Sequence, residues 1–276
     1  MRTVAEVAKT GSIVDAPLTV QNRPGGLTTT WEKTMITQHK GDDDQISVAS
    51  LSTVLLDVEE RSEYTLDDVT LLGGLVQENF AIVAAGDSQY QDLDAVMAAL
   101  KKDPKSVKVA SQLEDTLAFA LLAEEAGVDA SKVTFVSYEG GGEQATGVMN
   151  SDVDIAVAGV SEFVGLMQSG DLKGLAVIGK DAAPGLDVPT TADLGYETEF
   201  ANWRALIGPP DMPAYAVDYW EDAIGKITSS DSWKKVAERN NWTTTYRTGD
   251  ELQTLVDDTY KQITAAEDDL GRTIIP

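Results

Sequence analysis

The sequence of 276 residues lacks cysteine entirely and contains a single histidine, His39. Without cysteine there is no disulfide, no thiolate nucleophile and no cysteine-ligated zinc site. One imidazole is too few for a typical histidine-based metal cluster, and a Ser-His-Asp triad would have to use His39. That residue lies in a polar stretch before an acidic turn, where histidines are usually solvated. We therefore expect no cofactor and no metal site.

Positive charge is scarce as well. Lys and Arg number 21 against 46 Asp and Glu, which gives a formal net charge of −25 at pH 7. Such a charge argues against nucleic acid or anionic lipid as partners. Aliphatic residues recur in regular blocks, so the acid is interpreted as a hydrated coat on a folded body. We interpret this coat as an adaptation to high salt, with an ordinary acidic protein as the alternative.

Long apolar runs are missing too. No run approaches the length of about 18 apolar residues that a membrane span needs, and residues 1–6 lack the apolar core of a signal peptide. The chain is nevertheless long enough for one large or two medium α/β domains, each with its own core.

What the sequence contains is an alternation of strand and helix patterns, typical of open α/β layering. From Ala214 onward the pattern is mostly helical, with Trp220, Ile224 and Ile227 on one apolar face. Expected strands cover residues 18–20, 45–49, 69–85, 107–110, 134–138, 154–158, 175–178 and 205–207, and expected helices 3–9, 29–38, 92–101, 116–125, 144–149, 162–168 and 250–270, with turns at 22–26 and 50–53.

The most informative stretch is residues 132–158, which reads as a strand, a turn of three glycines, a helix and a second strand. Gly140, Gly141 and Gly142 leave backbone N–H groups at the start of the helix. These groups have no intrahelical partner and carry partial positive charge, so they can receive a carboxylate or a phosphate without Lys or Arg. The alternative is that the glycines merely permit a tight connection.

A series of short motifs carries a family resemblance across essentially the whole chain. By the order and spacing of these motifs, the chain resembles the substrate-binding proteins of the tripartite tricarboxylate transporter family, which are similar to the citrate receptor. The motifs are Val20-Gln21-Asn22-Arg23-Pro24-Gly25-Gly26, Tyr138-Glu139-Gly140-Gly141-Gly142-Glu143, Asp152-Val153-Asp154, the run from Gly170 to Val177, Asp187-Val188-Pro189-Thr190, Gly195-Tyr196, Asn202-Trp203-Arg204 and Pro209-Pro210.

The resemblance implies an α/β, two-lobed periplasmic-binding-protein fold, in which each lobe is a sheet flanked by helices and the ligand cleft lies between the lobes. Lobe I is expected to comprise residues 1–83 and 205–276, and lobe II residues 84–204. The implied function is that of an extracytoplasmic, monomeric receptor. It would capture a small carboxylate, a di- or tricarboxylate, by hinge closure and deliver it to the membrane permease of the transporter.

The resemblance also carries over a set of candidate ligand-binding residues, each of which lies in a loop or strand that faces the family's cleft. Arg204 could pair with a ligand carboxylate, or could form a structural salt bridge. The full set is Ser50, Ser52, Ser111, Thr116, Gly140, Gly141, Gly142, Ser161, Asn202, Trp203 and Arg204.

Two departures from the family pattern are expected to matter. The chain opens inside what should be the first helix, so we expect that the usual first strand and glycine-rich loop of lobe I have been truncated, with a start site assigned too late as the alternative. The loop at residues 111–116 carries two acids where the family commonly has glycines, which favours a smaller or less charged ligand. Two other functions stay open: a sensor of the same fold, and an enzyme that uses carboxylates such as Glu139 and Glu143 for hydrolysis.

Overall fold

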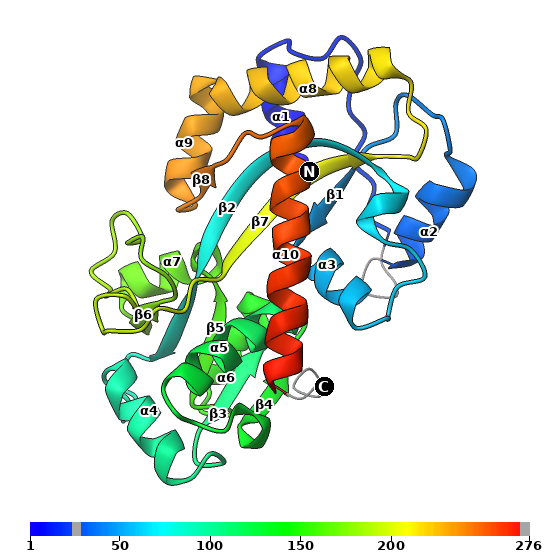
Figure 1. Cartoon of the computed structure of the whole chain (residues 1–276). Helices are drawn as coiled ribbons and strands as arrows, with labels where there is room; N and C mark the ends of the chain where they lie inside the picture. The colour runs from blue at the N-terminus through cyan, green and yellow to red at the C-terminus, as the bar shows by residue number, and fades with distance from the viewer. Residues whose placement is uncertain (24–28, 271–276) are drawn as a thin grey trace. The chain divides into compact units, whose positions relative to one another are not determined.

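A computed structural model of the chain describes residues 1–23 and 29–270 (Figure 1). The chain divides into two compact units. Unit 1 comprises Met1–Gln77 and Trp203–Thr264, and unit 2 comprises Glu78–Asn202 and the chain from Ala265 onward. The expected turn at residues 22–26 lies partly outside the described residues.

Unit 1 combines a small antiparallel sheet with helices. Its strands are β1 (Ser47–Ser50), β7 (Ala201–Gly208), the first half of β2 (Thr70–Ala85) and the short β8 (Thr243–Thr244). In the sheet, β7 pairs with both β1 and β2, and β8 pairs with β2. The helices are α1 (Arg2–Thr10), α2 (Thr29–Gln38), α3 (Leu51–Val58), α8 (Ala214–Ser229), α9 (Asp231–Arg239) and most of α10 (Gly249–Leu270).

The core of unit 1 is built by the apolar face of α8, as the helical spacing predicts. Trp220, Ile224 and Ile227 are all buried and pack with Leu72 of β2 and with Trp233 of α9. These three large side chains lie one helical turn apart and fill the space between the helices and the sheet.

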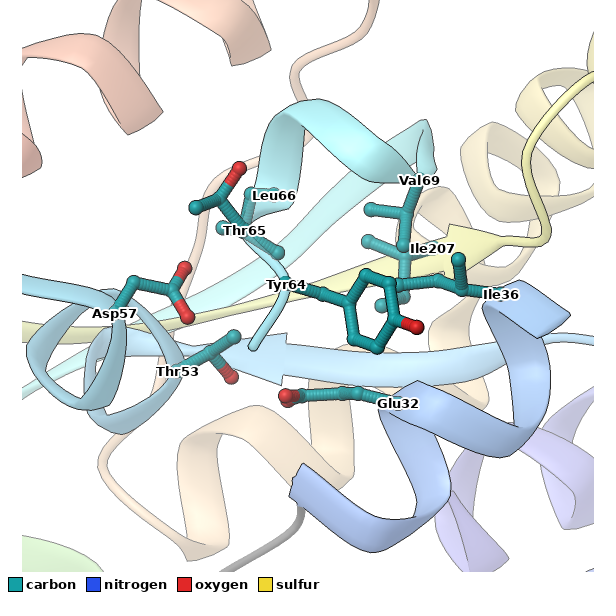
Figure 2. A pocket seen from close by; sticks show the side chains of 9 residues that line it. All are labelled: Glu32, Ile36, Thr53, Asp57, Tyr64, Thr65, Leu66, Val69 and Ile207. Atoms are coloured by element: carbon teal, nitrogen blue, oxygen red, sulfur yellow. The ribbon is translucent and has the colours of Figure 1, made fainter. Parts of the chain in front are cut away.

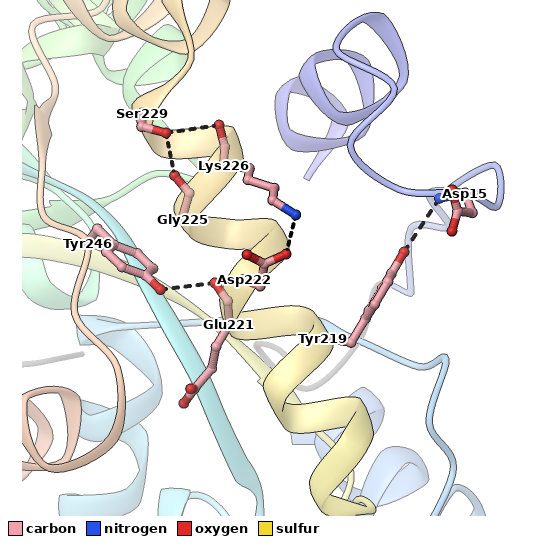
Figure 3. A network of polar contacts seen from close by, with 8 residues as sticks. All are labelled: Asp15, Tyr219, Glu221, Asp222, Gly225, Lys226, Ser229 and Tyr246. Carbon is pink, nitrogen blue, oxygen red and sulfur yellow. Dashed lines mark hydrogen bonds and ion pairs between the residues drawn. The ribbon is translucent and has the colours of Figure 1, made fainter.

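The outer side of α8 is tied to its surroundings by hydrogen bonds (Figure 3). The Tyr219 hydroxyl accepts from the Asp15 backbone N–H at 3.4 Å, and the Tyr246 hydroxyl donates to the Glu221 carbonyl at 3.0 Å. These contacts fix two irregular segments, before and after α8 in the sequence, against the helix. Such segments need these bonds because they lack the regular backbone hydrogen bonds of a helix or a sheet.

Unit 2 is a more regular strand-helix sandwich. Its strands are the second half of β2, then β3 (Lys108–Ser111), β4 (Thr134–Ser137), β5 (Ile155–Gly159) and β6 (Leu172–Val177). β3 pairs in parallel with both β4 and β5, whereas β2 runs antiparallel to β5 and β6. The helices are α4 (Leu93–Lys102), α5 (Leu113–Glu125), α6 (Gly141–Met149) and α7 (Val160–Ser169).

The second half of β2 is a run of apolar residues that the structure buries completely. Phe80, Ala81, Ile82, Val83 and Ala84 are all fully buried, because strands pair on both edges and other elements cover both faces. Such strands show no alternation of polar and apolar residues. Residues 78–85 therefore form the centre of the sheet of unit 2.

Two expectations from the sequence are wrong. Residues 18–20 form no strand, because the structure gives this short apolar stretch no pairing partner. The expected turn at residues 50–53 is instead the end of β1 and the first turn of α3. There Thr53 Oγ1 accepts from the Ser50 backbone N–H at 3.3 Å, a local bond that fixes the helix start.

Candidate functional site

Three helices of unit 2 begin where three parallel strands end. Strand β3 ends at Ser111 before α5, β4 ends at Ser137 before α6, and β5 ends at Gly159 before α7. The strands are parallel, so their carboxyl ends share one edge of the sheet, which is where ligands of open α/β sheets bind. Ser111, Thr116, the three glycines and Ser161 all belong to these strand-to-helix junctions.

The glycine turn holds a carboxylate of the protein itself. Gly140 precedes α6, and the backbone N–H of Gly141 donates to the Glu162 carboxylate at 2.7 Å. A Cβ atom on Gly141 would lie 2.7 Å from the Glu162 Cβ, so only glycine permits this approach. In this structure the Gly141 amide binds an anion of the chain itself, the Glu162 carboxylate of α7, and its predicted contact with a ligand stays a prediction.

The junction of β5 and α7 repeats the arrangement. The Glu78 carboxylate of β2 accepts from the backbone N–H of Ser161 at 3.2 Å. Glu78 is only 4% exposed. A Cβ atom on Gly159 would lie 2.7 Å from the Glu78 Cδ. A glycine again makes room for a carboxylate at the start of a helix, where the positive end of the helix dipole favours negative charge.

At the third junction the hydroxyls of Ser111 and Thr116 lie 2.7 Å apart, and both residues are buried. Between them in the sequence, Asp115 accepts from the Gln144 side-chain amide at 3.1 Å and from the Gln112 backbone N–H at 3.2 Å. Burial, and then the charges of Glu114 and Glu162, raise the pKa of Asp115 well above its usual range. Both causes favour the protonated, neutral form of this carboxyl.

In unit 1, the sheet brings two of the expected ligand contacts together. Ser50 at the end of β1 stands directly opposite Arg204 of β7 in the antiparallel register. Residues in such a pair have their side chains on the same face. Ser52 follows in the first turn of α3 and is half-buried.

The neighbouring expected contacts are more enclosed. Trp203 is buried, and its indole N–H donates to the Thr259 hydroxyl at 3.0 Å within unit 1. Asn202, which belongs to unit 2, is 3% exposed, and its side-chain amide donates at 3.4 Å to Glu114 of the same unit.

A small cavity lies in unit 1, of about the size that admits one water molecule. Figure 2 shows Glu32, Thr53 and Asp57 at one end of its lining, and Ile36, Val69 and Ile207 at the other. Burial, partly offset by the Tyr260 hydroxyl that donates to it, raises the pKa of Asp57 to about 7, and the Glu32 charge adds to the rise. Asp57 Oδ1 accepts no hydrogen bond from the described residues.

Sequence reasoning missed several of these residues. Glu78 gave a signal, since it is the sole charged residue in strand β2. Gln144 and Asp57 gave none, because polar residues on helices are common. In residues 1–23 and 29–270, no group of three or more His, Asp or Glu side chains is arranged to hold a metal ion.

Three solved structures illustrate the fold. A TctC solute-binding protein from Polaromonas without ligand shares 19% identity over 97% of this chain and 92% of its own, with a TM-score of 0.75. MatC from Rhodopseudomonas palustris with bound malate shares 19% over 96% and 92%, with a TM-score of 0.81. A second R. palustris protein, with adipate, shares 15% over 98% and 91%, with a TM-score of 0.86.

At these identities the likeness shows the fold alone, which is the expected α/β, periplasmic-binding-protein-like fold. A comparison with curated proteins finds no match. None of the helices in the described part of the chain is long and apolar enough to cross a membrane. The family model described as the tripartite tricarboxylate transporter family receptor matches residues 1–271. The chain therefore belongs to the tripartite tricarboxylate transporter receptor family, a family of solute-binding receptors rather than enzymes.

Proposed function

We propose that this protein is an extracytoplasmic receptor that captures a small carboxylate and delivers it to the membrane permease of a tripartite tricarboxylate-type transporter. The observation that carries the proposal is the bond of 2.7 Å between the Gly141 backbone N–H and a carboxylate. That carboxylate belongs to Glu162 of the chain itself, and the bond supports the proposal because it pairs an anion with a helix-start amide without Lys or Arg. The malate and adipate in the names of two structural neighbours support the same ligand class.

The proposed contacts lie in both units of the chain. Unit 2 contributes hydroxyls and backbone amides at its strand-to-helix junctions, and unit 1 contributes the cross-strand pair of Ser50 and Arg204. Arg204 offers the planar guanidinium that suits a carboxylate. The other proposed contacts are Ser52, Ser111, Thr116, Gly140, Gly141, Gly142, Ser161, Asn202 and Trp203.

The proposed mechanism is hinge closure of lobe I (residues 1–83 and 205–276) on lobe II (residues 84–204). A ligand with higher affinity for the closed state shifts the population towards it. The protein acts as a monomer in this scheme. Saturating ligand should therefore lower the radius of gyration in small-angle X-ray scattering.

The binding itself is tested by the thermal midpoint of unfolding, measured with a panel of mono-, di- and tricarboxylates. A ligand that binds the native state raises the free energy of unfolding by mass action, by about 2.7 kcal/mol at a ligand concentration one hundred times Kd. The thermal midpoint rises accordingly. The matched controls are the corresponding uncharged amides. A rise with one carboxylate class and none with its amides supports the proposal, and no rise with any carboxylate overturns it.

The acidic surface is proposed to be an adaptation to high salt. The net charge of −25 destabilises the compact state by self-repulsion at low ionic strength, and salt screens this repulsion. The free energy of unfolding should then rise between low and molar salt. Unchanged stability across that range would contradict the proposal.

A further inference from the structure

Two carboxylates of the chain already occupy backbone amides at the ligand-facing edge of unit 2. Glu162 accepts from Gly141 at 2.7 Å, and Glu78 accepts from Ser161 at 3.2 Å. In each junction a glycine leaves room for the carboxylate, Gly141 for Glu162 and Gly159 for Glu78. The recurrence of one arrangement at two helix starts distinguishes it from a single chance contact.

A resident carboxylate competes with a ligand carboxylate for the same N–H. A backbone amide has one proton to donate, so a ligand that uses Gly141 must first displace Glu162 from a charge-assisted bond. A ligand carboxylate that stays beside Glu162 is instead repelled by it. Glu162 is an exposed residue, which places its charge where a ligand can meet it.

A second observation concerns buried acceptors in the same cluster. Gln144 and Asn202 are 0% and 3% exposed, and their amides donate to Asp115 and Glu114 respectively. Gln144 Oε1 and Asn202 Oδ1 are buried and receive no hydrogen bond from the part of the chain that the structure describes. A buried acceptor without a donor is costly, so a ligand that supplies a donor to these oxygens when the site opens would gain binding free energy.

We infer that the receptor binds a small monocarboxylate that carries a hydrogen-bond donor, a hydroxyl or ammonium group, and that Glu162 is the residue that rejects a second carboxylate. This inference rests on the proposed function and narrows its ligand class. The Glu162 charge repels a ligand with a second carboxylate, and the acceptors of Gln144 and Asn202 favour a ligand with a donor. Together the two effects give specificity.

Four-carbon ligands separate the two parts of the inference. Butyrate has one carboxylate, 3-hydroxybutyrate adds a donor, and succinate adds a second carboxylate instead. We expect titration calorimetry on the wild-type protein to give the order 3-hydroxybutyrate, then butyrate, then succinate in affinity. The reverse order for 3-hydroxybutyrate and succinate in the wild-type protein would overturn the inference without any variant.

Glu162→Gln keeps the shape and an acceptor for the Gly141 N–H but removes the charge. It should raise the affinity for succinate relative to 3-hydroxybutyrate by roughly threefold to tenfold, the range expected for one partly screened charge. Glu162→Asp keeps the charge and should leave wild-type rejection of succinate in place. Glu238→Gln makes the same substitution at an exposed position of α9 and should change the ratio by less than about twofold.

The outcomes distinguish the inference from the function on which it rests. Carboxylate binding with the same succinate to 3-hydroxybutyrate ratio in wild type and Glu162→Gln would overturn the inference and leave the receptor function standing. No binding of any carboxylate, in the wild-type protein or the variants, would overturn both.

Discussion

The two units hold their carboxyl groups in different ways. At the sheet edge of unit 2, Glu78 and Glu162 accept from backbone amides at the starts of helices. In the cavity of unit 1, Asp57 accepts from the Tyr260 hydroxyl and faces the acidic Glu32. Backbone dipoles favour the charged form, whereas a neighbouring acid in a buried place favours the protonated form.

The difference assigns different work to the two regions. In unit 2 the Glu78 and Glu162 carboxylates satisfy backbone N–H groups at the proposed ligand-facing edge. In unit 1 the Asp57 carboxyl exchanges a proton close to neutral pH, because its pKa is about 7. Asp115 of unit 2 is the intermediate case, since an amide side chain and a backbone N–H hold it and burial among acids still raises its pKa.

The largest expected effect comes from removing a carboxylate that satisfies a backbone amide. Glu78→Ala deprives the Ser161 N–H of its acceptor and opens a cavity beside Gly159, which should lower the free energy of unfolding by about 2–4 kcal/mol. Urea unfolding measures the change. The exposed control Glu238→Ala in α9 should stay within about 0.5 kcal/mol of wild type. Equal effects of the two variants would remove the distinction between resident and surface carboxylates.

A smaller loss is expected when the side-chain donor of unit 1 is removed. Tyr260→Phe takes the hydroxyl from Asp57 and the acceptor from the Leu66 backbone N–H, and should cost about 1–3 kcal/mol. It should also raise the pKa of Asp57 further, because the hydroxyl bond lowers it. Tyr246→Phe is the matched control, since its hydroxyl bonds an exposed carbonyl, and should cost about 0.5 kcal/mol or less.

The pH dependence of stability tests the proton on Asp57. Its pKa is about 7 in the folded protein and near 3.8 when unperturbed, so between these values the folded state binds more protons than the unfolded state. Stability should therefore fall as pH rises from about 4 to 7 and level off above, by about 1–2 kcal/mol for this group after allowance for solvent screening.

Variants divide the pH slope between the two units. Asp57→Asn should remove the contribution of unit 1 to the pH dependence of the free energy of unfolding. That contribution depends on burial, Tyr260, Glu32 and Asp68. Asp115→Asn should remove a share of the same sign from unit 2. Free energies of unfolding at pH 5 and pH 8 decide the matter, and a slope unaltered by Asp57→Asn would contradict the raised pKa.

The smallest effect is expected at a neutral pair. Ser111→Ala removes the hydroxyl that lies 2.7 Å from the Thr116 hydroxyl, and should cost about 1 kcal/mol. Chemical denaturation of Ser111→Ala is compared with that of the exposed Ser169→Ala. If Ser111→Ala lowered the free energy of unfolding as much as Glu78→Ala, the carboxylate charge would add nothing to stability at this edge of the sheet.

The sequence predicts the regular elements well where the pattern is long. The expected helix at residues 29–38 has the bounds of α2, and the expected strand at 69–85 differs from β2 by one residue. Helix α3 was missed because its eight residues include Thr53 and Val54, whose β-branched side chains favour strands. The strand expected at residues 18–20 failed because a strand needs a partner, which three residues cannot reveal.

The type of the candidate site was predictable from the sequence, but the hydrogen-bond partners within it were not. The glycine turn identifies a helix start with backbone amides, and this part follows from local chemistry. That Glu162, 21 residues further along the chain, reaches Gly141 depends on how α6 and α7 pack after parallel strands. That Glu78 meets Ser161 depends on the pairing of β2 with β5, which local patterns do not encode.

The central claim is that this chain binds carboxylates through their negative charge. Titration calorimetry of the wild-type protein with 3-hydroxybutyrate and with 3-hydroxybutyramide, its uncharged counterpart, tests it most directly. The account predicts saturable binding of the acid and no measurable binding of the amide. Equal affinity for both, or binding of the amide alone, would contradict it.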